Sequence, residues 1–91
     1  MEDKEIPDVF IVTVVTERGD FEADMALPSL LTVGELRGKL IGILKILDGE
    51  RFRDWRGCRL RYGHRLLQDR DNLAEAGAFE GSRLVVSENP T

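Results

Sequence analysis

The chain lacks most of the features that mark secreted, membrane-spanning or cross-linked proteins. Its 91 residues include a single cysteine, Cys58, so no disulfide within the chain can stabilise it. The acidic start, residues 1–8, is not followed by the apolar segment of a signal peptide. No apolar run approaches the ~20 residues that span a bilayer. We therefore expect one domain, stabilised mainly by core packing and located in the cytoplasm.

Motifs of common enzyme and cofactor sites are also missing. The only histidine, His64, lies in a predicted turn, without a second histidine or a cysteine at metal-ligand spacing. The sequence has no Gly-rich phosphate loop and no pair of carboxylates at catalytic spacing. Cys58 should face the core as an unreactive thiol, and nothing places it in a shared cleft with His64. We expect no enzymatic activity, no cofactor, no metal and no small-molecule substrate.

Charge is distributed unevenly along the chain. The net charge is −4, but residues 51–70 contain seven arginines and two aspartates and carry +5, which leaves −9 for the rest. Such a distribution favours orienting a protein partner over attracting nucleic acid indiscriminately. No pattern of stacking aromatic residues accompanies the arginines, so the sequence predicts no nucleic-acid binding.

The first part of the chain predicts a β-hairpin. Residues 9–16 are β-branched and aromatic, as in a strand. Residues 21–27 alternate apolar with mostly acidic side chains, which is typical of a half-buried strand. Gly19 should form the turn at positive φ, and Pro28 should end the second strand because it cannot donate to a ladder.

A helix is predicted next. Thr32 and Glu35 have the spacing of a capping box, and Gly49 is the expected left-handed residue at the helix end. Apolar residues recur at helical spacing on one stripe: Val33, Leu36, Leu40, Ile43, Leu44 and Leu47.

The remaining elements are expected to be short. They are a strand over 55–62, a short strand at 66–67, one helical turn over 72–77 and a last strand over 82–87. The inward side chains of the two longer strands should be Cys58, Leu60, Tyr62, Leu84 and Val86. This order predicts an α+β fold, with a mixed sheet wrapped around one helix.

The spacing of the second half resembles that of the ubiquitin superfamily. There, a strand with the pattern R-L-x-[FY] precedes a turn, then L-x-D, a loop leucine and a leucine in the last strand. The matching residues here are Arg59-Leu60-Arg61-Tyr62, Leu67-Gln68-Asp69, Leu73 and Leu84. Pro28-Ser29 precedes the helix much as in ubiquitin. The resemblance covers residues 8 to 87 and implies the β-grasp architecture.

This resemblance divides the chain into a domain and two flanking segments. We expect a ubiquitin-like domain over residues 8–88, a disordered acidic segment over 1–7 and a short tail, 89–91, without Gly-Gly.

Within the superfamily, the chain is similar to the bacterial YukD/EsaB group of type VII secretion systems and to the ubiquitin-like domain of EccD. The similarity lies in residues 26–28, the helix that follows, residues 73–77 and residues 80–84. It implies a protein partner, a component of the secretion machine. It also implies a cytoplasmic protein, held near the inner membrane through that partner and not inserted directly.

Three departures from ubiquitin limit what the resemblance implies. The sequence after Val86 is SENPT, with no glycine for an adenylating enzyme to activate. Arg61 takes the position of ubiquitin's central apolar recognition residue, and Ser87 that of a second residue of the same patch. A receptor that buried Arg61 unpaired would lose several kcal/mol. We therefore expect neither conjugation nor binding to ubiquitin receptors.

Arginines form the first candidate partner-binding site. Arg59 and Arg61 should project from one strand face about 7 Å apart, with Arg65 in the next turn. Such a surface suits a carboxylate-rich partner, because arginine pairs bidentately with carboxylates. Arg51, Arg53 and Arg56 could extend it. Alternatively, these arginines only balance exposed acids: Glu22, Asp24, Asp54 and Asp69.

Glycines of the helix form the second candidate site. Gly34, Gly38 and Gly42 recur every four residues, and each costs up to roughly 1 kcal/mol relative to alanine in a helix interior. These glycines either form a groove for a partner's backbone or have no binding role and are tolerated because tertiary packing holds the helix. Trp55 is expected to pack in or at the rim of the core, with a binding anchor as the alternative.

Three functional alternatives remain from the sequence. The first is a docking module that is not conjugated, the second a protein modifier with an unusual or processed tail. The third is one assembly domain of a longer membrane protein.

Overall fold

Seven helices and strands follow one another between residues 7 and 89, the part of the chain that this computed structural model describes. They are β1 (Val9–Thr16), β2 (Glu22–Pro28), α1 (Val33–Leu47), α2 (Gly49–Phe52), β3 (Cys58–Tyr62), β4 (Arg65–Leu66) and β5 (Arg83–Glu88). The expectations for the acidic start and the tail fall almost wholly outside these residues. No helix within this part of the chain is long and apolar enough to cross a bilayer.

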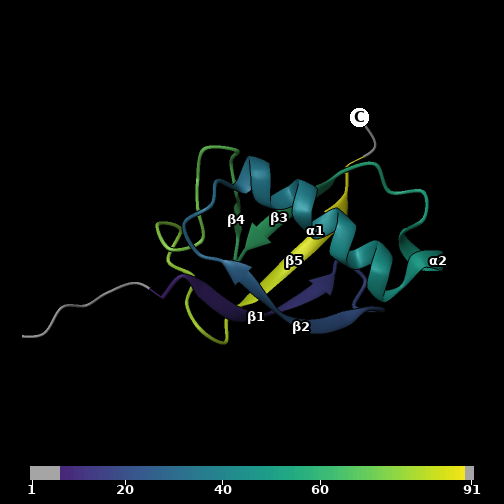
Figure 1. Ribbon diagram of the computed structural model, residues 1–91, viewed down its shortest axis with the longest axis horizontal. Helices are drawn as coiled ribbons and strands as arrows, with labels where there is room; N and C mark the ends of the chain where they lie inside the picture. Colours follow the sequence, from purple (N-terminus) through teal and green to yellow (C-terminus); the bar gives the residue numbers. More distant parts are fainter. Residues whose placement is uncertain (1–6, 90–91) are drawn as a thin grey trace, which may run out of the picture.

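The strands form one mixed sheet with the order β2-β1-β5-β3-β4. The pair β1–β5 is parallel, and the other neighbouring pairs are antiparallel. Helix α1 lies across one face of this sheet (Figure 1). The predicted α+β architecture, a mixed sheet wrapped around one helix, is therefore confirmed.

The hairpin of β1 and β2 forms as the alternation predicts. Gly19 has a φ of 77°, the positive value that its turn requires. The Thr16 hydroxyl secures this turn, since it donates to Asp20 (2.5 Å) and accepts from the Phe21 N–H (3.2 Å). In the second half, Gly77 closes the predicted helical turn with a φ of 96°.

Helix α1 begins as predicted but ends differently. Thr32 is the N-cap, and its hydroxyl accepts from the N–H of Glu35. Gly49 does not take the predicted positive φ. The chain turns at Asp48 instead, because the Asp48 carboxylate accepts from the N–H of Arg51 (3.2 Å) and caps a second helix.

Helix α2 lies between the predicted helix and the predicted strand over 55–62, where the sequence pattern indicated neither a helix nor a strand. Its Phe52 is fully buried. The Phe52 ring contacts Phe21 and Trp55 edge to face, with ring centroids 5.0 and 4.8 Å apart. Trp55 is half-buried and packs against the core, and β3 begins at Cys58 rather than at Trp55.

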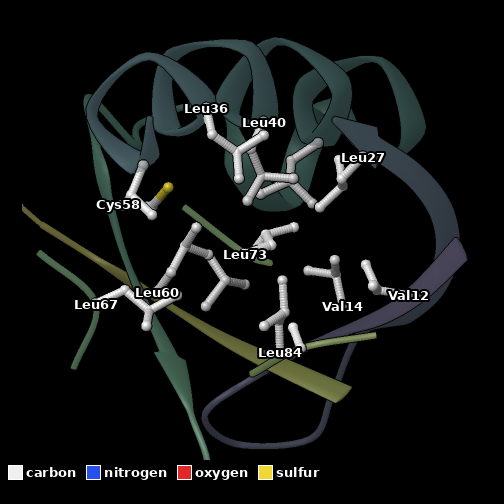
Figure 2. Close-up of a cluster of buried hydrophobic side chains, with 14 of the residues drawn as sticks. Val12, Val14, Leu27, Leu36, Leu40, Cys58, Leu60, Leu67, Leu73 and Leu84 are labelled. Atoms are coloured by element: carbon white, nitrogen blue, oxygen red, sulfur yellow. The ribbon is translucent and has the colours of Figure 1, made fainter. Parts of the chain in front are cut away.

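The core lies between α1 and the sheet. Figure 2 shows side chains of α1, β1, β3 and β5 pointing toward one another, with Leu73 among them. Leu47 was predicted to join the apolar stripe of α1, but it is 52% exposed because it is the last residue of the helix, where the chain turns away. Four helix residues are fully buried: Val33, Leu36, Leu40 and Leu44.

Candidate docking surfaces

The sheet face away from α1 carries the predicted strand arginines. Arg59 lies opposite Ser87 and Arg61 opposite Val85 in the β3–β5 ladder. Because successive strand residues point to opposite faces, both arginines project away from the buried side chains of β3. Arg59 is exposed and Arg61 half-buried. The predicted outward orientation is confirmed.

Ion pairs distinguish the three candidate arginines. Arg61 binds Glu17 with a 3.3 Å Nη1–Oε2 distance, and Arg65 binds Asp71 with a 3.3 Å Nη2–Oδ2 distance. None of the ion pairs within residues 7–89 includes Arg59. The Arg61–Glu17 pair is exposed on both sides, and such pairs contribute at most about 1 kcal/mol to stability. A ligand would compete with an internal acid at Arg61 and Arg65 but not at Arg59.

Three of the four acids that the sequence suggested for neutralising the strand arginines have other partners. Glu22 binds Arg83 (3.3 Å), Asp24 accepts from Thr13 (2.7 Å) and Asp69 binds Arg37 (2.5 Å). Acids therefore do neutralise Arg61 and Arg65, but these acids are Glu17 and Asp71 rather than those that the sequence suggested.

A groove of about 470 Å³ lies beside Arg59, at the β4 edge of the sheet. We call it the arginine groove; its lining includes Arg37, Arg59, Leu66, Leu67, Asp69 and Arg70. Leu67 is buried, whereas Leu66 is 47% exposed. The groove therefore combines three guanidinium groups with an accessible aliphatic surface.

Backbone hydrogen bonds fix one wall of the arginine groove. The N–H groups of Val33 and Gly34, at the start of α1, donate to the carbonyls of Asp71 (2.7 Å) and Asp69 (3.0 Å). A Cβ on Gly34 would lie 3.4 Å from the Asp69 Cβ. Gly34 thus permits a close approach of loop 68–71, which satisfies two of the N–H groups that a helix start leaves unpaired.

The three helix glycines do not share one environment. Gly38 lines a second groove of about 340 Å³, the helix groove, together with Gly34, Ile41 and Gly57. A Cβ on Gly38 or on Gly42 would meet nothing within 4 Å. Gly42 is exposed and lies outside the residues that line the groove. The structure brings only two of the three glycines into one concavity.

A third concavity, of about 490 Å³, surrounds the turn between β1 and β2 and is bordered by Trp55. Arg51 is held there by Asp20 (2.8 Å) and Asp48 (3.2 Å). The hydrogen bond from Thr16 and the charge of Arg51 lower the pKa of Asp20 below its ordinary value of 3.8. The lining of this third concavity contains as many arginines as acids: Arg18, Arg51 and Arg59 against Glu17, Asp20 and Glu88.

Cysteine and histidine are placed as expected. Burial raises the pKa of the Cys58 thiol to about 11, against a smaller opposing effect of Arg37. His64 is exposed in the turn between β3 and β4. Between residues 7 and 89, no three histidine, cysteine or carboxylate side chains are grouped so that they could hold a metal ion.

Of the residues that line the arginine groove, the sequence indicated only Arg59 as a binding residue; the missed residues include Arg37, Leu66 and Arg70. Arg70 belongs to the basic segment, so the charge count included it. Nothing in the local pattern places it near α1 or beside an exposed leucine, because the groove forms only when loop 68–71 is bound to the helix.

No protein-family model and no curated protein matches the chain significantly. Solved structures do resemble it. The ubiquitin of Caldiarchaeum subterraneum is 21% identical, with a TM-score of 0.66 over 91% of this chain and 96% of the other. The ubiquitin-like domain of the Mycobacterium tuberculosis type VII secretion protein EccD1 is 19% identical, with a TM-score of 0.70 over 88% and 98%.

A plant domain extends the same likeness. The ubiquitin-like domain of the Arabidopsis thaliana protein At2g32350 is 22% identical, with a TM-score of 0.61 over 93% of this chain and 81% of the other. At these identities the likeness concerns the architecture alone. Together with the sheet order, it identifies the chain as a ubiquitin-like β-grasp fold.

Proposed function

We propose that this protein is a ubiquitin-like docking module that binds a component of a type VII secretion machine without being joined to it covalently. The likeness to the EccD1 domain supports the choice of machine. The observation that carries the docking role is the open face of the sheet, where Arg59 projects and has no ion pair within residues 7–89. Guanidinium groups on such a face suit carboxylates of a partner.

The open face also supports a partner other than a ubiquitin receptor. Arg61 takes the position of ubiquitin's central apolar recognition residue and already binds Glu17. A receptor that buries an apolar patch would have to desolvate this pair. The free energy of desolvation exceeds the stabilisation that the attraction between the two charges provides.

The proposal assigns no catalytic role to the chain. Cys58 is 1% exposed and its thiol has a raised pKa of about 11, so little of the nucleophilic thiolate forms near neutral pH.

A pull-down from membranes of the native host tests the proposal. The wild-type protein should recover a secretion component, and the pair Arg59→Glu with Arg61→Glu should abolish that recovery while the thermal midpoint stays nearly unchanged. Lys39→Glu with Lys45→Glu is the matched control, since it makes the same charge change at exposed positions of α1 that line none of the three concavities. Recovery of no secretion component by the wild-type bait would contradict the proposal.

The likeness to an archaeal ubiquitin favours a protein modifier as a second candidate. A modifier would form a covalent adduct or a trimmed chain in its host. Intact mass measurement of the native protein separates the two candidates, because a docking module should show only the free chain. The EccD1 likeness also fits one assembly domain of a longer protein, which the length of the reading frame would decide.

A further inference from the structure

We propose that the arginine groove binds an acidic peptide segment, with Arg59 and Arg70 contacting its carboxylates and Leu66 contacting an aliphatic side chain. The inference rests on the proposed docking function and specifies the surface and the chemistry of the partner.

Charge within the groove is the first reason. Arg37 and Asp69 form a 2.5 Å ion pair and cancel each other. None of the ion pairs within the described residues includes Arg59 or Arg70. The lining residues therefore have a net charge of +2, and neither Arg59 nor Arg70 is in an ion pair within residues 7–89, although Arg59 also borders the concavity around the β1–β2 turn. A ligand with two carboxylates matches this charge.

The apolar part of the lining identifies the ligand as a peptide. Leu66 is 47% exposed and lines the groove together with Arg59 and Arg70, so an aliphatic group can bury surface against it. None of the described residues that line the groove is aromatic, so they offer bases no stacking surface. Acidic and aliphatic groups occur together in peptides but not in nucleic acids.

The groove is held in shape before any ligand arrives. Loop 68–71 is bound to α1 through the N–H groups of Val33 and Gly34. Asp71 also accepts from the N–H of Gln68 (2.7 Å) and binds Arg65 (3.3 Å). A wall that is already ordered loses less conformational freedom on binding, which favours affinity.

The other two concavities match an acidic ligand less well. The one around the β1–β2 turn has equal numbers of arginines and acids, so it presents no excess charge. The helix groove is lined by Arg37 and Arg56. Because Arg37 is paired with Asp69, this groove has one guanidinium outside the ion pairs of residues 7–89, against two in the arginine groove.

The test uses a fluorescent octapeptide with one leucine and three glutamates, and a matched peptide with glutamines. The ¹⁵N-labelled protein is titrated with each. The acidic peptide should shift the amide signals of residues 59 and 66–70, and Arg59→Gln with Arg70→Gln should weaken its affinity at least roughly tenfold. Lys39→Gln with Lys45→Gln removes the same charge at exposed positions of α1 outside all three concavities and should change the affinity less than about twofold. Dispersed amide spectra confirm that each variant folds.

Three results would overturn the assignment. They are equal affinity for the glutamine peptide, equal losses in the two double variants, and tighter binding of an oligonucleotide of the same charge. If the native partner is captured equally well by the Arg59→Gln, Arg70→Gln protein, docking stands and the groove assignment fails. If the wild-type protein captures no partner and binds no peptide, both proposals fail.

Discussion

Burial determines the chemistry of Cys58 at the scale of the single residue. The thiol lies between β3 and α1, where its Sγ approaches the Arg37 carbonyl at 3.9 Å. Its pKa is raised from an ordinary 9.0 to about 11 because the thiolate would lose its hydration. A core thiol of this kind acts as a small apolar side chain.

The Cys58 pKa gives a prediction for alkaline pH. The folded state holds the thiol proton more tightly than the unfolded state, so this contribution to stability is complete below pH 9 and is lost as the pH rises towards 11. Urea unfolding at pH 8, 9 and 10 should show that the free energy of unfolding falls with rising pH, and that it falls less in Cys58→Ala than in the wild-type protein. Parallel pH slopes for both proteins would contradict the raised pKa.

Alkylation provides an independent prediction for the same residue. Iodoacetamide at pH 8 should label Cys58 slowly in the native protein and rapidly in urea, because burial limits both access and thiolate formation. Labelling at the same rate in both states would show that the thiol is accessible.

Helix α1 presents a stability question at the scale of the element. Alanine at Gly38 or Gly42 would enter open space, and each substitution should raise the free energy of unfolding by about 0.5–1 kcal/mol. Gly34→Ala should raise the free energy of unfolding by less, because the added Cβ would lie 3.4 Å from the Asp69 Cβ. Chemical denaturation of the three variants measures these differences. A loss of stability at Gly38 would contradict the open environment found there.

The same helix offers a matched pair for testing the glycine hypothesis. Gly38→Leu would fill the helix groove, whereas Gly42→Leu would add the same side chain outside it. If a partner's backbone binds in that groove, only Gly38→Leu should reduce partner capture from host membranes. Equal capture by both variants would indicate glycines that tertiary packing merely tolerates.

Helix α2 should contribute more to stability than its four residues suggest. Phe52→Ala removes a fully buried ring that contacts Phe21 and Trp55, and we expect a loss of about 3–5 kcal/mol. Leu47→Ala, at a side chain that is 52% exposed, should cost less than about 1 kcal/mol. Urea denaturation compares the two variants, and similar losses would mean that Phe52 is not an anchor of the core.

Local patterns predicted the elements that local interactions determine. The hairpin follows from strand alternation and Gly19, and the start of α1 follows from the Thr32 cap. Helix α2 was missed because it depends on contact of Phe52 with Phe21 of the distant hairpin. Single-sequence patterns contain no signal for such a contact.

At the scale of the whole molecule, the arginine groove and the helix groove are neighbours, because Arg37 lines both. The outward direction of Arg59 was predictable from the two-residue period of a strand. The convergence of Arg37, Arg59 and Arg70 was not, because α1, β3 and loop 68–71 meet only after folding. The chain is acidic overall, with a net charge of −4, so its positive groove forms a local contrast that can orient an acidic partner.

Quantitative capture from host membranes tests non-covalent docking through the arginine groove most directly. The wild-type bait should recover a type VII secretion component that leaves under denaturing conditions, and its own intact mass should be that of the free chain. Arg59→Glu with Arg70→Glu should lose this component, while Lys39→Glu with Lys45→Glu retains it, because these lysines lie outside all three concavities. A partner that stays attached after denaturation, or that is captured equally by both variants, would contradict docking through the groove.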